Sequence, residues 1–246
     1  MKKKILITRP EPFATQLAQA MYAAGFDTIL CPMLEIVEPR KMTSLEKLFQ
    51  DLNFFDFAIF ISPTAVLKTF SKLKKPWPTH IKVFAIGQGT AKALMSQGIS
   101  KVIFPTSFCS ESLLAMEELK NVKNKKIIIF RGKGGRPLLG NALEAQGACV
   151  SHAVVYERKM PAILREKQLK LWKEARIDAI VVSSQEALEN MISLVGEKEK
   201  CWLQQQCFLV TSLKTQAYAH HQGFKTVLLA RDASDQAIID VLFRRT

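Results

Sequence analysis

The feature that most limits how this chain can fold is an internal repeat. Residues 4–9 read KILITR and residues 126–131 read KIIIFR, an offset of 122 positions. The same offset relates two further pairs, Gly25 to Gly147 and Ser62 to Ser184. Weaker matches continue in the same order with a small slip in register. Several matches in one order at a nearly constant offset indicate an ancient duplication, so we expect two related halves.

Each half reads as alternating strands and helices. Segments with a period of 3.6 residues, such as residues 15–22, predict helices, and Gly25 would end that one. Alternation of this kind predicts an α/β fold with parallel sheets and helices on both faces. Ligands of such sheets bind outside the carboxyl ends of the strands, and we expect the active site in a cleft between two lobes. Short apolar runs predict buried strands at residues 5–8, 57–61, 82–86, 101–104, 127–130, 149–155, 178–182, 207–211 and 226–229.

The loops after the predicted strands share hydrogen-bond donors. Backbone N–H groups at helix N-termini, hydroxyls and bare glycine backbone all favour anions. Any one of these loops can equally be a helix cap with no ligand role, so it is their number that predicts a large anionic ligand. None has the glycine spacing of a nucleotide-binding motif, which disfavours nucleotide cofactors. The loops are residues 8–10, 62–65, 87–90, 105–107, 131–136, 183–185 and 211–215.

The charge of the chain agrees with an anionic partner. Its 246 residues include 35 Lys and Arg against 22 Asp and Glu, a net charge of +13, although solubility alone is an alternative reason for such a charge. The lysine clusters at residues 2–4, 72–75 and 123–126 are scattered, which argues against a nucleic-acid-binding surface. No apolar run is long enough for a membrane span or a signal peptide, so we expect a cytoplasmic protein without a membrane partner.

Few residues suit covalent or metal chemistry. The five cysteines are odd in number and widely spaced, which indicates neither disulfides nor a metal site, and Cys31 and Cys149 lie in apolar runs typical of core residues. No histidine has a partner at a diagnostic spacing, so catalysis would rest on positioning and electrostatics. Tyr156 is the exception. It ends a strand-like run, and its hydroxyl can donate a proton at neutral pH, whereas the alternative is an amphipathic residue at a domain edge.

Several short motifs, taken in order, resemble the uroporphyrinogen-III synthase family of tetrapyrrole (haem) biosynthesis along essentially the whole chain. Their order and spacing are more specific than any one of them. The motifs are residues 7–10 (ITRP), 60–66 (FISPTAV), 85–94 (AIGQGTAKAL), 131–139, 147–158 and 234–237 (SDQA). The resemblance implies two flavodoxin-like domains joined by a two-stranded linker. Domain 1 would combine residues 1–33 with 162–246, domain 2 would be residues 40–152, and the linkers would lie near 34–39 and 153–161.

The resemblance also implies an activity. The family closes hydroxymethylbilane, a linear tetrapyrrole with eight carboxylates, to uroporphyrinogen III, inverting the last ring and losing water with no metal and no cofactor. We therefore expect a monomeric, cofactor-independent lyase with Tyr156 as its catalytic residue. The implied substrate-binding residues are Thr8, Arg9, Ser62, Thr64, Gly87, Thr90, Ser110, Arg131, Gly132, Arg136, Ser184 and Thr215.

The second half of the chain departs from the family pattern. Ser212 stands where the family usually has Gly, and Gln185 where it often has Pro, which weakens the roles implied for Ser184 and Thr215. A rival interpretation is a non-catalytic two-domain binding protein for an anionic small molecule. Such a protein would explain the donor-rich loops but would have no use for Tyr156.

Overall fold

Two separate parallel sheets organise the chain in the computed structural model, which describes residues 2–40, 42–106, 109–135 and 137–244. By its internal contacts the chain divides into unit 1, Met1–Ile36 with Lys159–Thr246, and unit 2, Val37–Arg158. The chain passes between the units at β3 (Glu35–Val37) and at the end of β8 (Cys149–Lys159). These two strands are neighbours in the sheet of unit 2.

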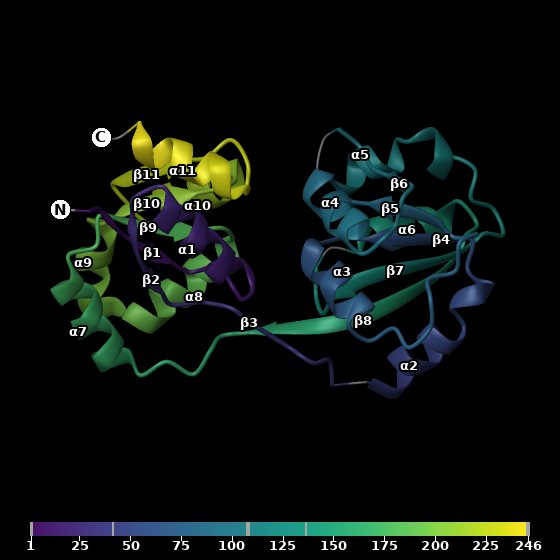
Figure 1. Ribbon diagram of the computed structural model, residues 1–246, viewed down its shortest axis with the longest axis horizontal. Helices are drawn as coiled ribbons and strands as arrows, with labels where there is room; N and C mark the ends of the chain where they lie inside the picture. Colours follow the sequence, from purple (N-terminus) through teal and green to yellow (C-terminus); the bar gives the residue numbers. More distant parts are fainter. Residues whose placement is uncertain (1, 41, 107–108, 136, 245–246) are drawn as a thin grey trace. The chain divides into compact units, whose positions relative to one another are not determined.

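Unit 1 is a five-stranded parallel sheet with helices on both faces (Figure 1). Its strand order is β11-β10-β9-β1-β2, which in order along the chain is the flavodoxin-like arrangement 2-1-3-4-5. The elements are β1 (Lys4–Ile7), α1 (Phe13–Ala23), β2 (Asp27–Leu30), α7 (Arg165–Ala175), β9 (Ala179–Val182), α8 (Gln185–Val195), the 3₁₀ helix η3 (Glu197–Glu199), α9 (Lys200–Gln204), β10 (Cys207–Val210), α10 (Leu213–His221), β11 (Thr226–Leu229) and α11 (Asp235–Phe243).

Unit 2 is built on a sheet of order β3-β8-β7-β4-β5-β6, in which the strands from β8 to β6 pair in parallel. Besides β3 and β8, its elements are α2 (Met42–Gln50), η1 (Leu52–Phe54), β4 (Phe57–Phe60), α3 (Pro63–Phe70), β5 (Lys82–Ala85), α4 (Gln88–Ser96), β6 (Val102–Ile103), α5 (Ser110–Leu114), η2 (Glu117–Leu119), β7 (Lys126–Gly132) and α6 (Leu138–Ala145).

Each sheet combines strands from both halves of the repeat. At the offset of 122 residues, β1 corresponds to β7 and β4 to β9. In unit 1, β1 and β2 join strands β9 to β11 from the second half, and in unit 2, β7 and β8 join strands β4 to β6 from the first half. The two sheets therefore have the same order of repeat-equivalent strands, and the sequence repeat is not itself the folded unit. The predicted α/β class with parallel sheets is confirmed.

Side-chain alternation explains why the central strands are buried on both faces. In unit 1, Leu6 faces one core cluster with Trp172 of α7, whereas Ile5 and Ile7 face another with Leu17 of α1. Neighbouring residues of a strand point to opposite faces, so a sheet covered twice by helices needs continuous apolar runs. These runs are the strands that the sequence pattern detects.

Three details differ from the sequence expectation. Strands β2 and β3 were absent from the predicted set, because their residues are exposed or half-buried and form no continuous buried run. Cys31 is buried as expected, and burial raises the pKa of its thiol to about 11. The core position predicted for Cys149 is wrong, because Cys149 is exposed at the start of β8. Tyr156 does not end its strand, since β8 continues to Lys159.

Candidate active site

Three predicted site residues meet at the carboxyl edge of the unit 2 sheet. Strands β4, β7 and β8 are neighbours, so Ser62 after β4, Gly132 at the end of β7 and Tyr156 within β8 come together. The Ser62 Oγ and the Tyr156 hydroxyl are 3.2 Å apart, within hydrogen-bond distance. Tyr156 is buried, with 5% of the residue exposed.

The Tyr156 ring rests on the backbone of Gly132. A Cβ added at Gly132 would lie 2.5 Å from Cζ and 2.9 Å from the hydroxyl oxygen of Tyr156. A break in the strand register between Arg131 and Gly132 brings Gly132 opposite Tyr156, and the Lys133 N–H donates to the Tyr156 carbonyl at 2.9 Å. Bulges of this kind re-aim a side chain near a site, and here the bulge and the missing Cβ together set the position of the phenol.

Ser62 links this phenol to a helix N-terminus. It is the N-cap of α3, and its Oγ accepts the Ala65 N–H at 3.0 Å, with Pro63 at the first helical position. Either hydroxyl can be the donor in the contact with Tyr156, because Oγ keeps a second lone pair after it accepts from the helix. When Ser62 is the donor, the Tyr156 proton points away from Ser62 and is available to another acceptor.

Charged groups hold the strand around Tyr156. The neighbouring Glu157 carboxylate accepts the Arg40 N–H at 3.0 Å and pairs with Lys133 at 3.2 Å. The Arg40 N–H lowers the pKa of Glu157 most, and Lys133 lowers it further. Sequence reasoning did not single out these contacts, because Arg40 and Glu157 lie far apart along the chain and no local spacing relates them.

Arg131 is engaged with its own loop. Its guanidinium donates to the Gly132 carbonyl at 3.4 Å and to the Gly134 carbonyl. Arg136, the other arginine implied for this loop, lies outside the described residues.

Arg131 also affects the imidazole of His152. Partial burial lowers the pKa of His152, and the positive charge of Arg131 lowers it further, while Glu144 acts in the opposite direction.

The other predicted residues of unit 2 lie at helix starts along the same edge. Gly87 is the N-cap of α4 and offers no side-chain cap, while Thr90 in the first turn is buried. Thr64 is half-buried in the first turn of α3. Ser110 begins α5, whose cap is the Cys109 Sγ.

Unit 1 gathers its predicted residues at the carboxyl edge of its own sheet, and most of them are already bonded within the protein. The Thr8 hydroxyl is fully buried and donates to the Val181 carbonyl at 2.9 Å. The Arg9 guanidinium donates to Asp235 and to the Ala233 carbonyl, each at 2.6 Å. Through these bonds Thr8 joins the end of β1 to β9, and Arg9 joins it to the start of α11.

Two serines of unit 1 repeat the capping role of Ser62. Ser184 caps α8 by accepting the Ala187 N–H at 3.2 Å. Ser212 caps α10 by accepting the Thr215 N–H at 3.2 Å, and the Ser212 and Thr215 hydroxyls are 2.9 Å apart. Thr215 is buried, so the exposed hydroxyl at this loop is that of Ser212, the residue that departs from the family pattern. Within the described residues, no cluster of three His, Cys, Asp or Glu side chains could hold a metal.

A family model described as uroporphyrinogen-III synthase HemD matches residues 15–240 of the chain. The chain belongs to the uroporphyrinogen-III synthase family. Its similarity to individual family members extends along almost its whole length. It is 31% identical over 243 residues to the uroporphyrinogen-III synthase of Salmonella typhimurium (strain LT2) and 30% identical over 243 residues to that of Escherichia coli (strain K12). Each alignment covers 97% of this chain and 99% of the relative.

Solved structures of two synthases have the same fold. The chain matches uroporphyrinogen-III synthetase from Helicobacter pylori 26695 with a TM-score of 0.63 at 19% identity, covering all of both chains. It matches a mutant uroporphyrinogen III synthase from the extremely thermophilic bacterium Thermus thermophilus with a TM-score of 0.62 at 18% identity, covering 99% and 98% of the two chains. The family match includes Ser62, Gly132 and Tyr156, whereas Thr8 and Arg9 precede it. No helix in the described part of the chain is long and apolar enough to cross a membrane.

Proposed function

We propose that this protein is a cofactor-independent uroporphyrinogen-III synthase, a lyase that closes hydroxymethylbilane to uroporphyrinogen III with inversion of the last ring and loss of water. Membership of the family supports the reaction. The observation that carries the mechanism is the phenol of Tyr156, held on Gly132 and bonded to Ser62 at the carboxyl edge of a parallel sheet. Ligands of such folds bind at this edge.

The substrate would be held mainly by donors and positive charge. The bilane carries eight carboxylates, and the chain has a net charge of +13. Ser62 and Gly87 in unit 2 and Ser184 and Ser212 in unit 1 stand at helix N-termini, where backbone N–H groups favour anions. We expect carboxylates of the substrate to bind such groups.

The first chemical step is loss of the substrate hydroxyl. Tyr156 donates its proton to that hydroxyl, the carbon–oxygen bond breaks, and water leaves with the bonding electrons to give an azafulvene cation. Ser62 positions the phenol through the contact between the two hydroxyls. Once Tyr156 has lost its proton, the Ser62 hydroxyl is the donor in this contact and stabilises the phenolate.

Carbon–carbon bonds are then exchanged. The substituted α-carbon of the last ring attacks the cation and forms a spiro intermediate. Fragmentation breaks the bond from that carbon to the methylene of the preceding ring, which becomes a second azafulvene cation. The unsubstituted α-carbon of the last ring then attacks this cation and loses its proton, which restores the Tyr156 phenol and leaves the ring inverted. The enzyme's contribution is to fold the substrate so that this closure is faster than the simple one.

The decisive experiment is incubation with freshly prepared hydroxymethylbilane, followed by oxidation and chromatographic separation of the isomers. We expect uroporphyrinogen III at a rate far above spontaneous closure. Formation of isomer I alone at the spontaneous rate would overturn the proposal and favour a binding protein. Tyr156→Phe should lower turnover on the order of 10²-fold without abolishing it. Unchanged turnover would remove Tyr156 from the mechanism.

We further propose that the protein is a cytoplasmic monomer that acts without nucleic acid or membrane. The positive charge of the chain would then serve to attract a soluble polyanionic substrate. Sedimentation equilibrium in the presence and absence of substrate tests the monomer, and a salt-sensitive mobility shift with oligonucleotides at physiological ionic strength would contradict the absence of nucleic-acid binding.

A further inference from the structure

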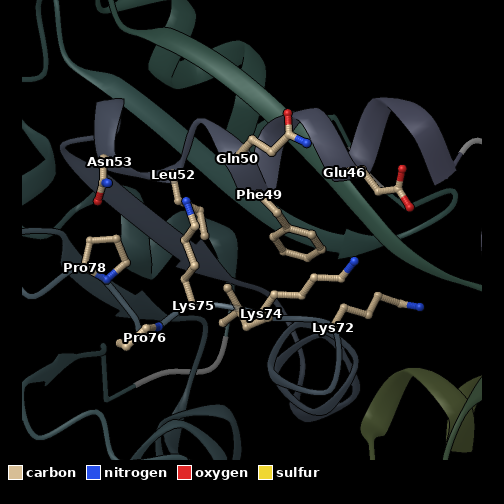
Figure 2. A pocket seen from close by; sticks show the side chains of 11 residues that line it. Glu46, Phe49, Gln50, Leu52, Asn53, Lys72, Lys74, Lys75, Pro76 and Pro78 are labelled. Carbon is tan, nitrogen blue, oxygen red and sulfur yellow. The ribbon is translucent and has the colours of Figure 1, made fainter.

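Unit 2 contains a second hollow, lined by residues other than those predicted for the active site. A pocket of about 750 Å³ lies between α2 with η1 on one side and the loop from α3 to β5 on the other (Figure 2). These segments lead into the amino ends of β4 and β5, whereas Ser62 and Gly87 follow the carboxyl ends of the same strands. Ser62, Gly132 and Tyr156 are not among the residues that line the pocket, so we treat it as a second site.

The pocket has a flat aromatic wall with a firm backing. Figure 2 shows the Phe49 ring turned from α2 toward the facing loop. This ring is stacked on Phe130 with centroids 6.3 Å apart and an angle of 19°, and Phe130 is stacked on Phe60 at 4.5 Å. The opposite wall is held by Trp77, which stacks on Phe70 at 5.5 Å. Prolines flank Trp77 and restrict the loop further, so the space is preformed.

The facing loop supplies positive charge. Lys72, Lys74 and Lys75 line the pocket together with Glu46, the one acidic residue among the described residues of its lining. Lys72 is neutralised by an ion pair with Glu38. Lys74 and Lys75 are exposed, and neither has an ion pair within the described part of the chain.

We propose that this pocket binds a small, flat aromatic anion, such as an aromatic carboxylate. The ring of the ligand would lie against Phe49, Leu52 and Leu73, and its anionic group would lie between the ammonium groups of Lys74 and Lys75. The volume is in the range of small-molecule sites, which combine apolar walls with a few polar groups that fix orientation. A hollow that only held water would need neither the aromatic wall nor two unpaired cations.

The probe is pyrene-1-carboxylate, compared with its neutral analogue 1-pyrenemethanol, in fluorescence anisotropy titrations of the full chain. We expect the carboxylate to bind at least about tenfold more tightly than the alcohol, since hydrogen bonds from the two ammonium groups to a charged carboxylate together contribute on the order of a factor of ten. Its affinity should fall as salt is raised. No saturable binding up to about 1 mM, or equal binding of the two probes, overturns the proposal.

Variants locate the binding. Lys74→Gln with Lys75→Gln should weaken the carboxylate about tenfold and leave the alcohol unchanged. The matched control is Lys167→Gln with Lys225→Gln, two exposed lysines of unit 1 that remove the same charge, and it should change affinity less than about twofold. Phe49→Leu, which keeps an apolar side chain, should weaken both probes. Equal loss in the control pair would mean general electrostatic attraction and would overturn the site.

Turnover of hydroxymethylbilane separates this site from the proposed synthase activity. The Lys74/Lys75 double variant should keep wild-type turnover and isomer ratio, because its lysines line a pocket that contains none of the candidate site residues. A loss of turnover would assign these lysines to the substrate and contradict a separate site. An inactive wild-type protein that still binds the pyrene carboxylate would leave this inference standing while the proposed function failed.

Discussion

The ring of Tyr156 occupies the space that a side chain at Gly132 would need. A Cβ at position 132 would lie 2.5 Å from Cζ of Tyr156, a distance at which one of the two groups must move. The backbone of Gly132 is not left-handed, so another residue could adopt its conformation. Glycine is therefore required here for close approach, and the position of the phenol depends on it.

Gly132→Ala should displace Tyr156 and so affect both stability and catalysis. We expect the free energy of unfolding to fall by about 1–3 kcal/mol, as for other insertions into a packed site, because the buried ring must shift. Turnover of hydroxymethylbilane should fall at least as much as in Tyr156→Phe, since the phenol leaves Ser62. Urea denaturation and the isomer assay measure the two effects.

The control for this substitution is Gly89→Ala. A Cβ at Gly89 would meet Pro63 Cγ at 3.9 Å, an ordinary contact, and alanine is favoured in helix α4. Its free energy of unfolding should be unchanged or slightly raised. If Gly132→Ala is as well tolerated as Gly89→Ala, the ring does not rest on Gly132 as described.

Ser62→Ala should cost more than the equivalent change in the other half of the repeat. Both Ser62 and Ser184 cap a helix, by accepting N–H groups at 3.0 and 3.2 Å, so each loses about 1 kcal/mol of stability on truncation. Ser62 also loses its bond to Tyr156, which should add about 0.5–1.5 kcal/mol.

A double-mutant cycle isolates that bond. The free energies of unfolding of Ser62→Ala, Tyr156→Phe and the double variant should show a coupling of about 0.5–1.5 kcal/mol. Ser184→Ala combined with Tyr156→Phe should be additive. Additivity in both cycles would show that the Ser62–Tyr156 contact contributes nothing.

Arg9 is expected to act mainly on the stability of unit 1. Its guanidinium is largely buried and bonded at 2.6 Å both to Asp235 and to the Ala233 carbonyl. Arg9→Lys cannot reproduce this fork, so the free energy of unfolding should fall by about 1–2 kcal/mol, with a similar loss for Asp235→Asn. The KM for hydroxymethylbilane should change little. A raised KM with unchanged stability would instead support the substrate contact predicted from the sequence.

The central strands and the site edge could be predicted because their signals are local. Continuous apolar runs mark strands buried on both faces, and a Ser or Gly at their ends marks the following helix start, as at Ser62 and Gly87. Strands β2 and β3 could not be predicted in this way, because half-exposed edge strands lack such runs.

The contacts that decide the roles of residues could not be predicted in the same way. The side chains of Thr8 and Arg9 are of types that bind anions. Their hydrogen-bond partners Val181 and Asp235, however, lie more than 170 positions away along the chain. Whether a hydroxyl or guanidinium is available to a ligand depends on such partners, which no local spacing reveals. The packing of Tyr156 on Gly132 is likewise a tertiary contact, set by a bulge between two strands.

His152 should make the protein less stable in mild acid. Burial lowers the pKa of this imidazole most and Arg131 lowers it further, whereas Glu144 raises it. The folded state thus favours the neutral ring, while the unfolded chain takes up a proton near pH 6.5. The contribution of His152 is fully present above about pH 6.5 and is lost as the pH falls toward the lower folded pKa.

Removing the imidazole should therefore flatten the pH dependence of stability. Urea unfolding between about pH 8 and pH 5 should show a smaller loss for His152→Gln than for the wild type. His80→Gln, which removes an imidazole from an exposed loop of the same unit, is the matched control. Parallel curves for the wild type and His152→Gln would mean that the His152 pKa is not lowered by folding. A steeper curve for His152→Gln would mean that Glu144 outweighs both burial and Arg131.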